Sequence, residues 1–225
     1  MTESGKPRIA IIGGSGELGS GLAALWSAAG YEVVIGSRSA DRARAFAETV
    51  GRGVAGTDNV SAAQASDVVV IAVPYASHDE TLHDIKDAVQ GKIVIDAVVP
   101  LLPPKVSVVQ LPAAGSAAQI AQTILGEGVR VVSAFHTIGA AKLRDGHRAD
   151  CDVLVFGNDK AARDIVIGLA GAIATRGIDG GVLANSAAAE ALTSVLIAIN
   201  RRYKVRGAGI RITGLDEVRP SNSVA

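Results

Sequence analysis

The residues best suited to chemistry lie near the start of the chain, where an apolar run meets closely spaced glycines. Residues 9–12 are continuously apolar, as in a strand buried on both faces. Gly14, Gly16 and Gly19 follow with the spacing G-x-G-x-x-G and open a helix. In this pattern the first glycine permits a tight turn, the second lets the backbone approach a pyrophosphate, and the third lets the helix pack closely on the strand. The free N–H groups of the helix start attract phosphate, so the pattern predicts a dinucleotide site.

The end of the second expected strand indicates which nucleotide binds. Enzymes that bind NAD usually carry Asp or Glu there for the ribose 2′-hydroxyl, but this chain has Gly36, Ser37 and Arg38. Arg38 offers a fork of donors suited to phosphate oxygens, Ser37 adds a hydroxyl, and Arg42 lies one helical turn further on. Alternatively, the two arginines are charges at the start of a helix that only contact solvent. Their position favours NADP over NAD.

The elements expected along the chain alternate between strands and helices. Strands are expected at residues 9–12, 32–35, 67–73, 92–97, 129–135 and 152–156. Helices are expected at residues 17–29 with Gly30 after the end, 39–50 with Ser39 as the cap, 77–89, from Ser116 onward, 159–175, and from Asn185 or Ser186 onward. This order predicts an α/β fold with a Rossmann-type, doubly wound, mostly parallel sheet and a small C-terminal helical segment. A loop at residues 98–112 holds four prolines, and loops of this length tend to line sites.

The bulk composition argues against several classes of partner. The 225 residues include 22 basic and 22 acidic ones, so no net charge attracts nucleic acid or a membrane surface. No apolar run reaches about 18 residues, so we expect neither a membrane span nor a signal peptide. The single cysteine, Cys151, excludes an internal disulfide and favours a reducing compartment, so we expect a cytoplasmic protein.

Three stretches together resemble the NADPH-dependent reductases of coenzyme F420, an 8-hydroxy-5-deazaflavin. They are IGGSGELGSGLA followed by VVIGSR, then SAFHTIGAAKL, then LANSAAAEALTSVLIAINRRYKVRGAGIRITGL. The resemblance extends from Arg8 to Leu215. It implies that residues 1–180 form an NADP-binding Rossmann domain and that residues 181–215 form a small segment that closes the deazaflavin pocket. Residues 216–225 are expected to be a disordered tail.

The resemblance also implies roles for individual residues. The residues implied for NADP are Ser15, Gly16, Glu17 and Leu18 at the pyrophosphate, Ser37, Arg38 and Arg42 at the 2′-phosphate, and Pro74 and Tyr75 near the nicotinamide. Ala140 is implied on the floor of the pocket that the two rings share, and the small residue Val73 is expected to bind the cofactor near the rings. The residues implied for the deazaflavin are Val98, Val99, Pro100, His136, Thr137 and Ala208. Gly139 stands where the family leads us to expect proline, and Ala208 where it leads us to expect leucine. Both departures concern the deazaflavin side.

Hydride transfer between two flat rings needs orientation more than acid–base groups, so we assign no catalytic residue and no metal. His136 ends a strand on the ligand side of the sheet and is either a pocket residue or a hydrogen-bonded structural histidine. His78 and His83 are expected to be solvated, and Asp96 to order a loop. The charge concentration Arg201, Arg202, Lys204, Arg206 and Arg211 either compensates a helix end or attracts the anionic side chain of the deazaflavin.

The predicted function is hydride transfer between NADP(H) and coenzyme F420. The alternatives are an NADPH-dependent reductase of another small acceptor and a non-catalytic NADP-binding sensor. About 45 residues follow Gly180, which is short for the helical substrate domain of most other such reductases. A homodimer is expected if Leu192, Val195, Leu196 and Ile199 bury against a partner helix.

Overall fold

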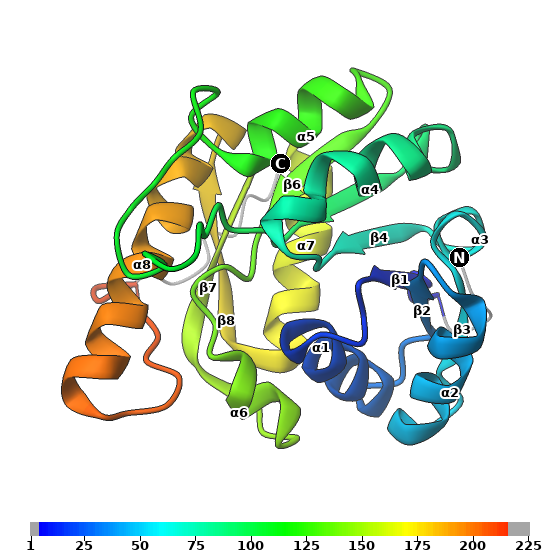
Figure 1. The fold of residues 1–225 in the computed structure, drawn as a ribbon, viewed down its shortest axis with the longest axis horizontal. Helices are drawn as coiled ribbons and strands as arrows, with labels where there is room; N and C mark the ends of the chain where they lie inside the picture. Colours follow the sequence, from blue (N-terminus) through cyan, green and yellow to red (C-terminus); the bar gives the residue numbers. More distant parts are fainter. Residues whose placement is uncertain (1–4, 216–225) are drawn as a thin grey trace, which may run out of the picture.

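The computed structural model describes residues 5–215, which form an α/β sandwich (Figure 1). The predicted disordered tail, residues 216–225, lies outside the described residues. The strands are β1 (Ile9–Ile12), β2 (Val33–Ser37), β3 (Ala55–Asp58), β4 (Val68–Ile71), β5 (Ile93–Asp96), β6 (Arg130–Ser133), β7 (Ala149–Gly157) and β8 (Ala174–Gly181). The α-helices are α1 (Glu17–Ala28), α2 (Ala40–Val50), α3 (Asn59–Gln64), α4 (His78–Ile85), α5 (Ala117–Leu125), α6 (Ala140–Arg144), α7 (Lys160–Ile173) and α8 (Ser186–Tyr203). The short 3-10 helices are η1 (Tyr75–Ser77), η2 (Lys86–Val89) and η3 (Leu183–Asn185).

In the described part of the chain the strands form one sheet in the order β3-β2-β1-β4-β5-β6-β7-β8. β1 to β6 are mutually parallel, β7 runs antiparallel to β6, and β8 pairs parallel with β7. The predicted mostly parallel, doubly wound sheet is therefore confirmed. The order reverses at β1, between β2 and β4, which is where such folds bind dinucleotides.

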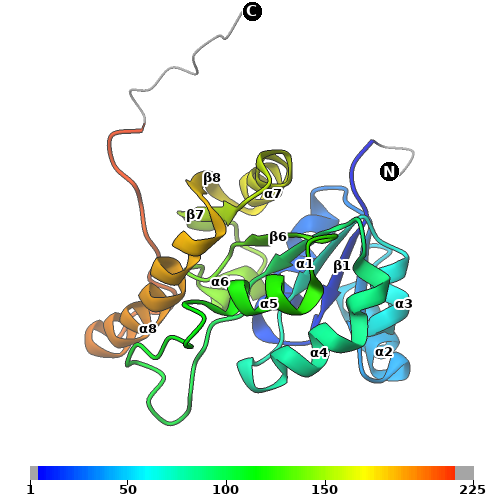
Figure 2. The same cartoon turned by 90° about the horizontal axis from the view of Figure 1, so that it is seen from above.

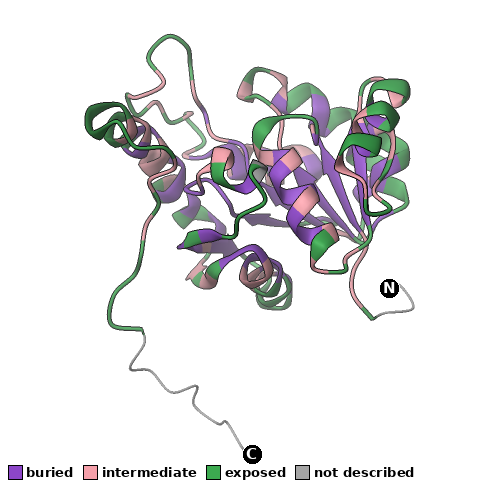
Figure 3. Ribbon diagram, turned by 90° about the horizontal axis from the view of Figure 1, so that it is seen from below, coloured by how far each residue is buried: buried purple, intermediate pink, exposed green. Residues whose placement is uncertain are grey.

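Helices cover both faces of the sheet, and alternate residues of each central strand supply the two cores. Ile9 and Ile11 of β1 pack with α1, α2 and α7, whereas Ala10 and Ile12 pack with α3, α4 and α5. This alternation explains why the central strands are uninterrupted apolar runs. Figure 3 shows the resulting buried layer through the middle of the molecule.

The first core contains the one tryptophan of the chain. Trp26 of α1 is fully buried, and its indole Nε1 donates a hydrogen bond of 2.9 Å to the carbonyl of Leu169 on α7. Its ring meets Phe135 edge to face with the centroids 5.6 Å apart. Trp26 thus connects α1, whose N-terminus faces the predicted nucleotide, to α7 and to Phe135 within the same core.

Several expected boundaries are confirmed and others are wrong. Ser39 caps α2 through its side chain, Ser116 caps α5, and Gly30 adopts a left-handed φ of 79° just after α1. The expected helix at 77–89 is divided into η1, α4 and η2, and the expected strand 67–73 is only β4. β3, α3, α6 and β8 were not expected; residues 174 and 175 belong to β8 rather than to the preceding helix.

The C-terminal segment lies along the side of the sheet formed by β7 and β8 (Figure 2). After α8 the chain reaches Asp152 of β7, whose backbone N–H donates to the carbonyl of Ile210 at 2.8 Å. The Asp152 carboxylate accepts from the N–H of Ile212 at 2.7 Å and from Arg176 at 2.9 Å, and these bonds hold the pKa of the carboxyl below its usual value despite its burial. Asp152 therefore anchors residues 210–212 to the sheet.

Within residues 5–215 one helical stretch, Leu183–Tyr203, is long and apolar enough to cross a membrane by length and composition alone. It is not an unbroken apolar run, because Asn185, Glu190 and Asn200 interrupt it. Glu190 and Thr193 of this stretch form hydrogen bonds with α5 and with the loop after β6.

Candidate functional site

The glycine loop joins β1 to α1 at the carboxyl edge of the sheet, and its glycines have separable roles. The left-handed φ of 80° belongs to Gly13. The turn glycine therefore lies one residue before Gly14, where the motif predicted it. A Cβ on Gly14 would lie 2.9 Å from the Ile35 side chain, and a Cβ on Gly19 would lie 2.7 Å from the Cα of Gly14. Gly13 therefore makes the turn, while Gly14 and Gly19 permit close packing.

Gly16 differs from the other glycines of the motif because the protein itself nearly accommodates a side chain there. A Cβ on Gly16 would meet only the Gly13 carbonyl at 3.4 Å and the Ala72 carbonyl at 3.9 Å. Gly16 is the N-cap of α1 and is exposed, as are Ser15 and Glu17, while Leu18 is half-buried. Internal packing thus does not explain the glycine, whereas a phosphate seated on the first N–H groups of α1 does, so the loop fits a dinucleotide.

The end of β2 carries the residues predicted to bind the 2′-phosphate. Ser37 is half-buried and ends the strand, Arg38 follows it and is exposed, and Arg42 is exposed in the first turn of α2. Among the described residues neither arginine forms an ion pair within the chain, whereas Arg44 pairs with Asp41. Two free guanidinium groups beside a strand end without a carboxylate fit a phosphate.

The remaining predicted residues follow the neighbouring strands β4, β5 and β6 at the same edge (Figure 1). Val73 and Pro74 follow β4, Val98, Val99 and Pro100 follow β5, and His136 and Thr137 follow β6. Because carboxyl ends of parallel strands meet at one edge, the fold brings these three groups together beside the glycine loop.

Ala140 and Ala208 come together through a close approach of two glycines. Ala140 opens α6 directly after Gly139, and a Cβ on Gly139 would lie only 2.5 Å from the Cα of Gly207. The N–H of Ala208 donates to the Asn200 side chain at 2.9 Å. The departure from proline at residue 139 therefore matches a backbone contact that leaves no room for a side chain.

His136 is the most unusual polar residue at this edge. Its side chain is buried, its Nε2 lies 3.4 Å from the Ser133 hydroxyl, and its Nδ1 has no partner in the described structure. Burial lowers its pKa to about 4, so the imidazole is neutral at physiological pH. An unpartnered buried nitrogen beside a predicted ligand pocket fits a hydrogen bond to the ligand.

His78 is not solvated as expected, although His83 is exposed. The His78 side chain is fully buried, with Nε2 2.7 Å from Asp96 Oδ2 and Nδ1 3.3 Å from Asp79 Oδ1. Burial opposes its protonation, but the bonds to Asp96 and Asp79 outweigh it and raise the pKa of His78. The helical spacing of His78 with Leu82 and Ile85, both buried, was a signal for this position.

The pair formed by His78 and Asp96 orders two site loops, which the sequence did not predict for His78. Asp96 Oδ1 accepts from the N–H of Val98 at 2.9 Å, so the predicted loop-ordering role of Asp96 is confirmed. His78 begins α4 just after Pro74 and η1. The pair therefore joins the loop after β4 to the loop after β5.

The expected basic cluster is divided in the structure. Arg201 and Arg202 lie in the last turn of α8, and Arg201 donates to the Ser107 hydroxyl at 3.2 Å. Arg211 pairs with Asp150 instead. The exposed cations available to an anionic ligand are therefore Arg201, Arg202, Lys204 and Arg206.

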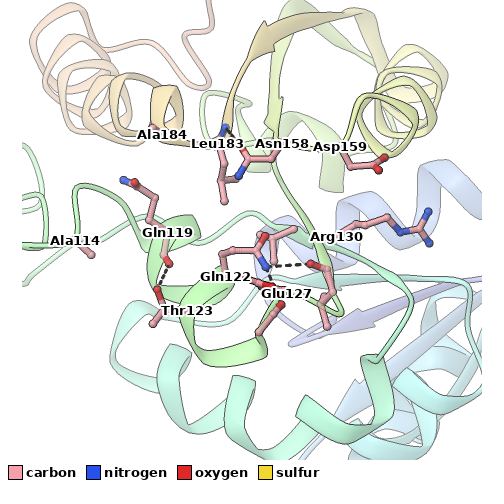
Figure 4. Close-up of a pocket in the computed structure, with 13 residues that line it drawn as sticks. Ala114, Gln119, Gln122, Thr123, Glu127, Arg130, Asn158, Asp159, Leu183 and Ala184 are labelled. Atoms are coloured by element: carbon pink, nitrogen blue, oxygen red, sulfur yellow. Dashed lines mark hydrogen bonds between the residues drawn. The ribbon is translucent and has the colours of Figure 1, made fainter.

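A groove of about 840 Å³ lies elsewhere, between α5 and the start of α7 (Figure 4). Polar side chains including Gln119, Gln122 and Asn158 line this groove. None of the residues predicted to bind NADP or the deazaflavin lines it. Within residues 5–215, no three His, Cys, Asp or Glu side chains are grouped as metal ligands would be. The open carboxyl edge of the sheet, rather than this groove, is the candidate site.

The strand order, the glycine loop at the reversal of that order and the arginines after β2 define a dinucleotide-binding protein of the Rossmann class. A profile of the family described as "NADP oxidoreductase coenzyme F420-dependent" matches residues 8–100. The F420-dependent NADP reductase of Methanocaldococcus jannaschii is 39% identical over 93% of this chain and 99% of its own. That of Methanothermobacter thermautotrophicus is 40% identical over 93% of this chain and 96% of its own. The chain belongs to the family of F420-dependent NADP reductases.

Solved structures agree with the fold. A hypothetical protein, SMa0349, from Sinorhizobium meliloti has a TM-score of 0.69 and 28% identity and covers 82% of this chain and 90% of its own. A pyrroline-5-carboxylate reductase from Coxiella burnetii has a TM-score of 0.57 at 21% identity and covers 88% of this chain and 79% of its own, which supports the fold alone.

Proposed function

We propose that this protein transfers a hydride between NADP(H) and coenzyme F420. The observation that carries the proposal is the 37–40% identity to F420-dependent NADP reductases over 93% of the chain, nearly the full length of each. The site geometry supports it, because a glycine loop suited to pyrophosphate adjoins a second set of loops with an unpartnered buried imidazole.

The proposed NADP site runs along the carboxyl ends of β2, β1 and β4. Gly14, Ser15, Gly16, Glu17 and Leu18 surround the pyrophosphate, and Ser37, Arg38 and Arg42 bind the 2′-phosphate. Val73, Pro74 and Ala140 lie beside the nicotinamide. The two arginines select NADP over NAD because a guanidinium fork matches phosphate oxygens.

The proposed deazaflavin site adjoins it at the ends of β5 and β6. Its residues are Val98, Val99, Pro100, His136, Thr137 and Ala208. His136 offers its neutral Nδ1 to the edge of the ring, and the small apolar residues exclude water from the ring faces. When bound, the two ring systems supply the redox chemistry, with the hydride passing between carbon 4 of the nicotinamide and carbon 5 of the deazaflavin.

The chain itself contributes orientation rather than proton transfer. The pair formed by His78 and Asp96 holds the loops that carry Pro74 and Val98 in register, so the two ring sites keep a fixed separation. Residues 181–215 close the deazaflavin site, and the exposed cations at the end of α8 face its anionic side chain.

The outer face of α8 bears on the oligomeric state. A homodimer formed through the outer face of α8 is proposed because Val195 is 44% exposed and Ile199 is 36% exposed on that face. Light scattering of the purified protein tests this oligomeric state.

A cytoplasmic location is proposed from the lone cysteine, which is a buried free thiol.

An activity assay separates the proposal from its alternatives. The protein is mixed with NADPH and oxidised F420 while the visible absorbance of the deazaflavin is followed, with NADH as the comparison. Loss of the band with NADPH supports the proposal. NADPH binding without turnover indicates a sensor, and turnover of an imine but not of F420 indicates another acceptor.

A further inference from the structure

The buried face of α8 binds the rest of the molecule through polar side chains at helical spacing. The Ser186 hydroxyl donates to the hydroxyl of Ser116, the N-cap of α5, at 2.8 Å. Glu190, one turn further on, accepts from the N–H groups of Ala117 at 2.7 Å and Ala118 at 3.2 Å. Side chains of α8 thus accept hydrogen bonds from the free N–H groups at the start of α5. These bonds keep α8 from rotating about its axis or shifting along it relative to α5.

The same face reaches the predicted deazaflavin site three residues beyond Glu190. The hydroxyl of Thr193 donates to the backbone carbonyl of His136 at 3.0 Å. His136 carries the unpartnered buried nitrogen. The position of the imidazole is thus connected through Thr193 to the position of α8, and through Glu190 to α5.

Glu190 is a costly residue for simple packing. Its side chain is 1% exposed, and within the described residues no Lys or Arg forms an ion pair with it. Burial raises its pKa to about 7, although the two N–H bonds work against the shift. An apolar residue would avoid this cost, which indicates a role beyond filling space.

We propose that Glu190 is a positioning residue for the acceptor site: by binding the start of α5 it holds α8 where Thr193 fixes the backbone of His136. The inference rests on the proposed function for the identity of the acceptor. The bridge itself is a property of the free protein. We expect it to act on the deazaflavin side, because the bond from Thr193 ends on His136, in the loop after β6.

The bridge is expected to depend on pH. A carboxylate accepts both N–H groups, whereas a protonated carboxyl directs its own O–H toward one of these donors. The titratable groups near Glu190 are Asp96 of β5, whose charge favours protonation, His78 of α4, whose charge opposes it, and Tyr75 of η1. F420 binding should therefore weaken as the pH falls through about 7.

The test compares Glu190→Gln with the wild type and with Glu127→Gln, a control at an exposed residue after α5. Steady-state KM for F420, kcat and the dissociation constant for NADPH are measured from pH 6 to pH 8.5. For Glu190→Gln at pH 8 we expect KM for F420 to rise about tenfold, as for one charged hydrogen bond lost, with NADPH binding changed less than about twofold. The variant should also lose the pH dependence of KM, while Glu127→Gln keeps the wild-type profile and so accounts for titration of F420 itself.

A second measurement does not need F420. Hydrogen exchange at the amides of residues 117 and 118, corrected for intrinsic rates, should show protection in the wild type that falls between pH 8 and pH 6. Glu190→Gln should show low protection at both pH values, with unchanged protection in β1 and α1. Thr193→Val is expected to raise KM for F420 and to leave the protection at residues 117 and 118 intact.

Each result decides one of the two claims. Absence of turnover and of F420 binding in the wild type would overturn the proposed function, and the exchange data would still report whether the bridge exists. Equal F420 KM and equal exchange in the wild type and Glu190→Gln would overturn the role of Glu190. A parallel loss of NADPH binding, or of protection in β1, would also overturn it, because the residue would then support the whole fold.

Discussion

Gly16 and Gly19 belong to one motif but are glycines for different reasons: Gly16 leaves space for a ligand, and Gly19 allows close packing of the protein itself. A Cβ at Gly16 meets nothing closer than 3.4 Å, whereas at Gly19 it lies 2.7 Å from the Cα of Gly14. Gly16→Val should abolish NADPH binding with little change in Tm, because the side chain enters the pyrophosphate space. Gly19→Val should lower Tm markedly through the backbone clash. Calorimetry and thermal unfolding of both variants provide the measurement, and wild-type NADPH affinity in Gly16→Val would contradict the site.

Arg38 tests the choice of nucleotide. Its exposed guanidinium follows β2, which ends in Ser37 rather than in Asp or Glu, and the neighbouring Asp58 of β3 caps α3 through Ser61. Arg38→Ala should raise KM for NADPH by a factor equivalent to about 1–3 kcal/mol and change KM for NADH little. Steady-state kinetics with both nucleotides measure this, and Arg44→Ala, which removes a guanidinium paired with Asp41, is the control. Equal effects of Arg38→Ala on both nucleotides would contradict the assignment.

His136 has a stability effect whose sign follows from its pKa. The unfolded imidazole binds a proton below about 6.5, but burial keeps the folded imidazole neutral down to about 4. The unfolded state therefore binds more protons in this window, and the stability present above pH 6.5 is lost as the pH falls toward 4. The loss should approach about 3 kcal/mol for a shift of this size.

Urea unfolding of the wild type and of His136→Asn from pH 4 to pH 7 measures this loss. The variant should show a smaller decline on acidification, because asparagine does not titrate. Glu190 has a raised pKa and so contributes the opposite trend, but it is common to both proteins and cancels in the comparison. Parallel curves for the two proteins would show that His136 is protonated equally in both states.

At the scale of elements, the end of α8 tests the role of the exposed cations. Arg201, Arg202 and Lys204 are exposed, and only Arg201 has a described partner, the Ser107 hydroxyl. Replacing all three with Glu should weaken F420 binding at low salt, and the difference should shrink as salt rises, because exposed charges are screened over about 10 Å at 0.1 M. Titrations of F420 and NADPH at two salt concentrations measure it.

NADPH affinity should change little in this triple variant, since the proposed phosphate-binding residues lie at the other end of the sheet. Unchanged F420 affinity at low salt would show that the cluster only compensates the helix dipole. Reversing Arg211, which already pairs with Asp150, serves as the matched control for added negative charge.

The sequence predicted the central elements better than the edges, and the reason is burial. β1, β4 and β5 are buried on both faces and read as apolar runs. The two unexpected strands, β3 (AGTD) and β8 (ATRGIDGG), are the two edges of the sheet, where half-exposed residues need not be apolar. Edge strands of this kind follow from pairing partners that a single sequence does not reveal.

The candidate site also contains some residues that the sequence predicts and others that it does not. The glycine loop and the arginines after β2 could be predicted because local spacing determines them. The prediction for His78 was wrong because this polar residue shares a helical register with Leu82 and Ile85, which places it on the buried face of α4. The roles of Glu190 and Asp152 depend on contacts with residues more than fifty positions away, so no local pattern carried them.

For the whole molecule, the fold brings the residues of the two proposed ring sites to one edge of the sheet. The reversal of strand order at β1 locates the nucleotide, and the loops after β5 and β6 adjoin it. The C-terminal segment then reaches back to this edge through the contacts of Glu190, Thr193 and Gly207. This arrangement suits direct transfer between two bound rings rather than a chemical intermediate on the protein.

Direct transfer is most simply tested with an isotope. NADPH carrying deuterium at both positions of nicotinamide carbon 4 is incubated with the protein and oxidised F420, and the reduced deazaflavin is analysed by mass spectrometry. Direct transfer predicts one deuterium at carbon 5 of the product. When unlabelled NADPH is used in deuterated water, no deuterium should be found at carbon 5, because solvent supplies only the exchangeable proton at the ring nitrogen. Reduced F420 without the label, or no reduction while NADPH stays bound, would contradict hydride transfer between the two sites.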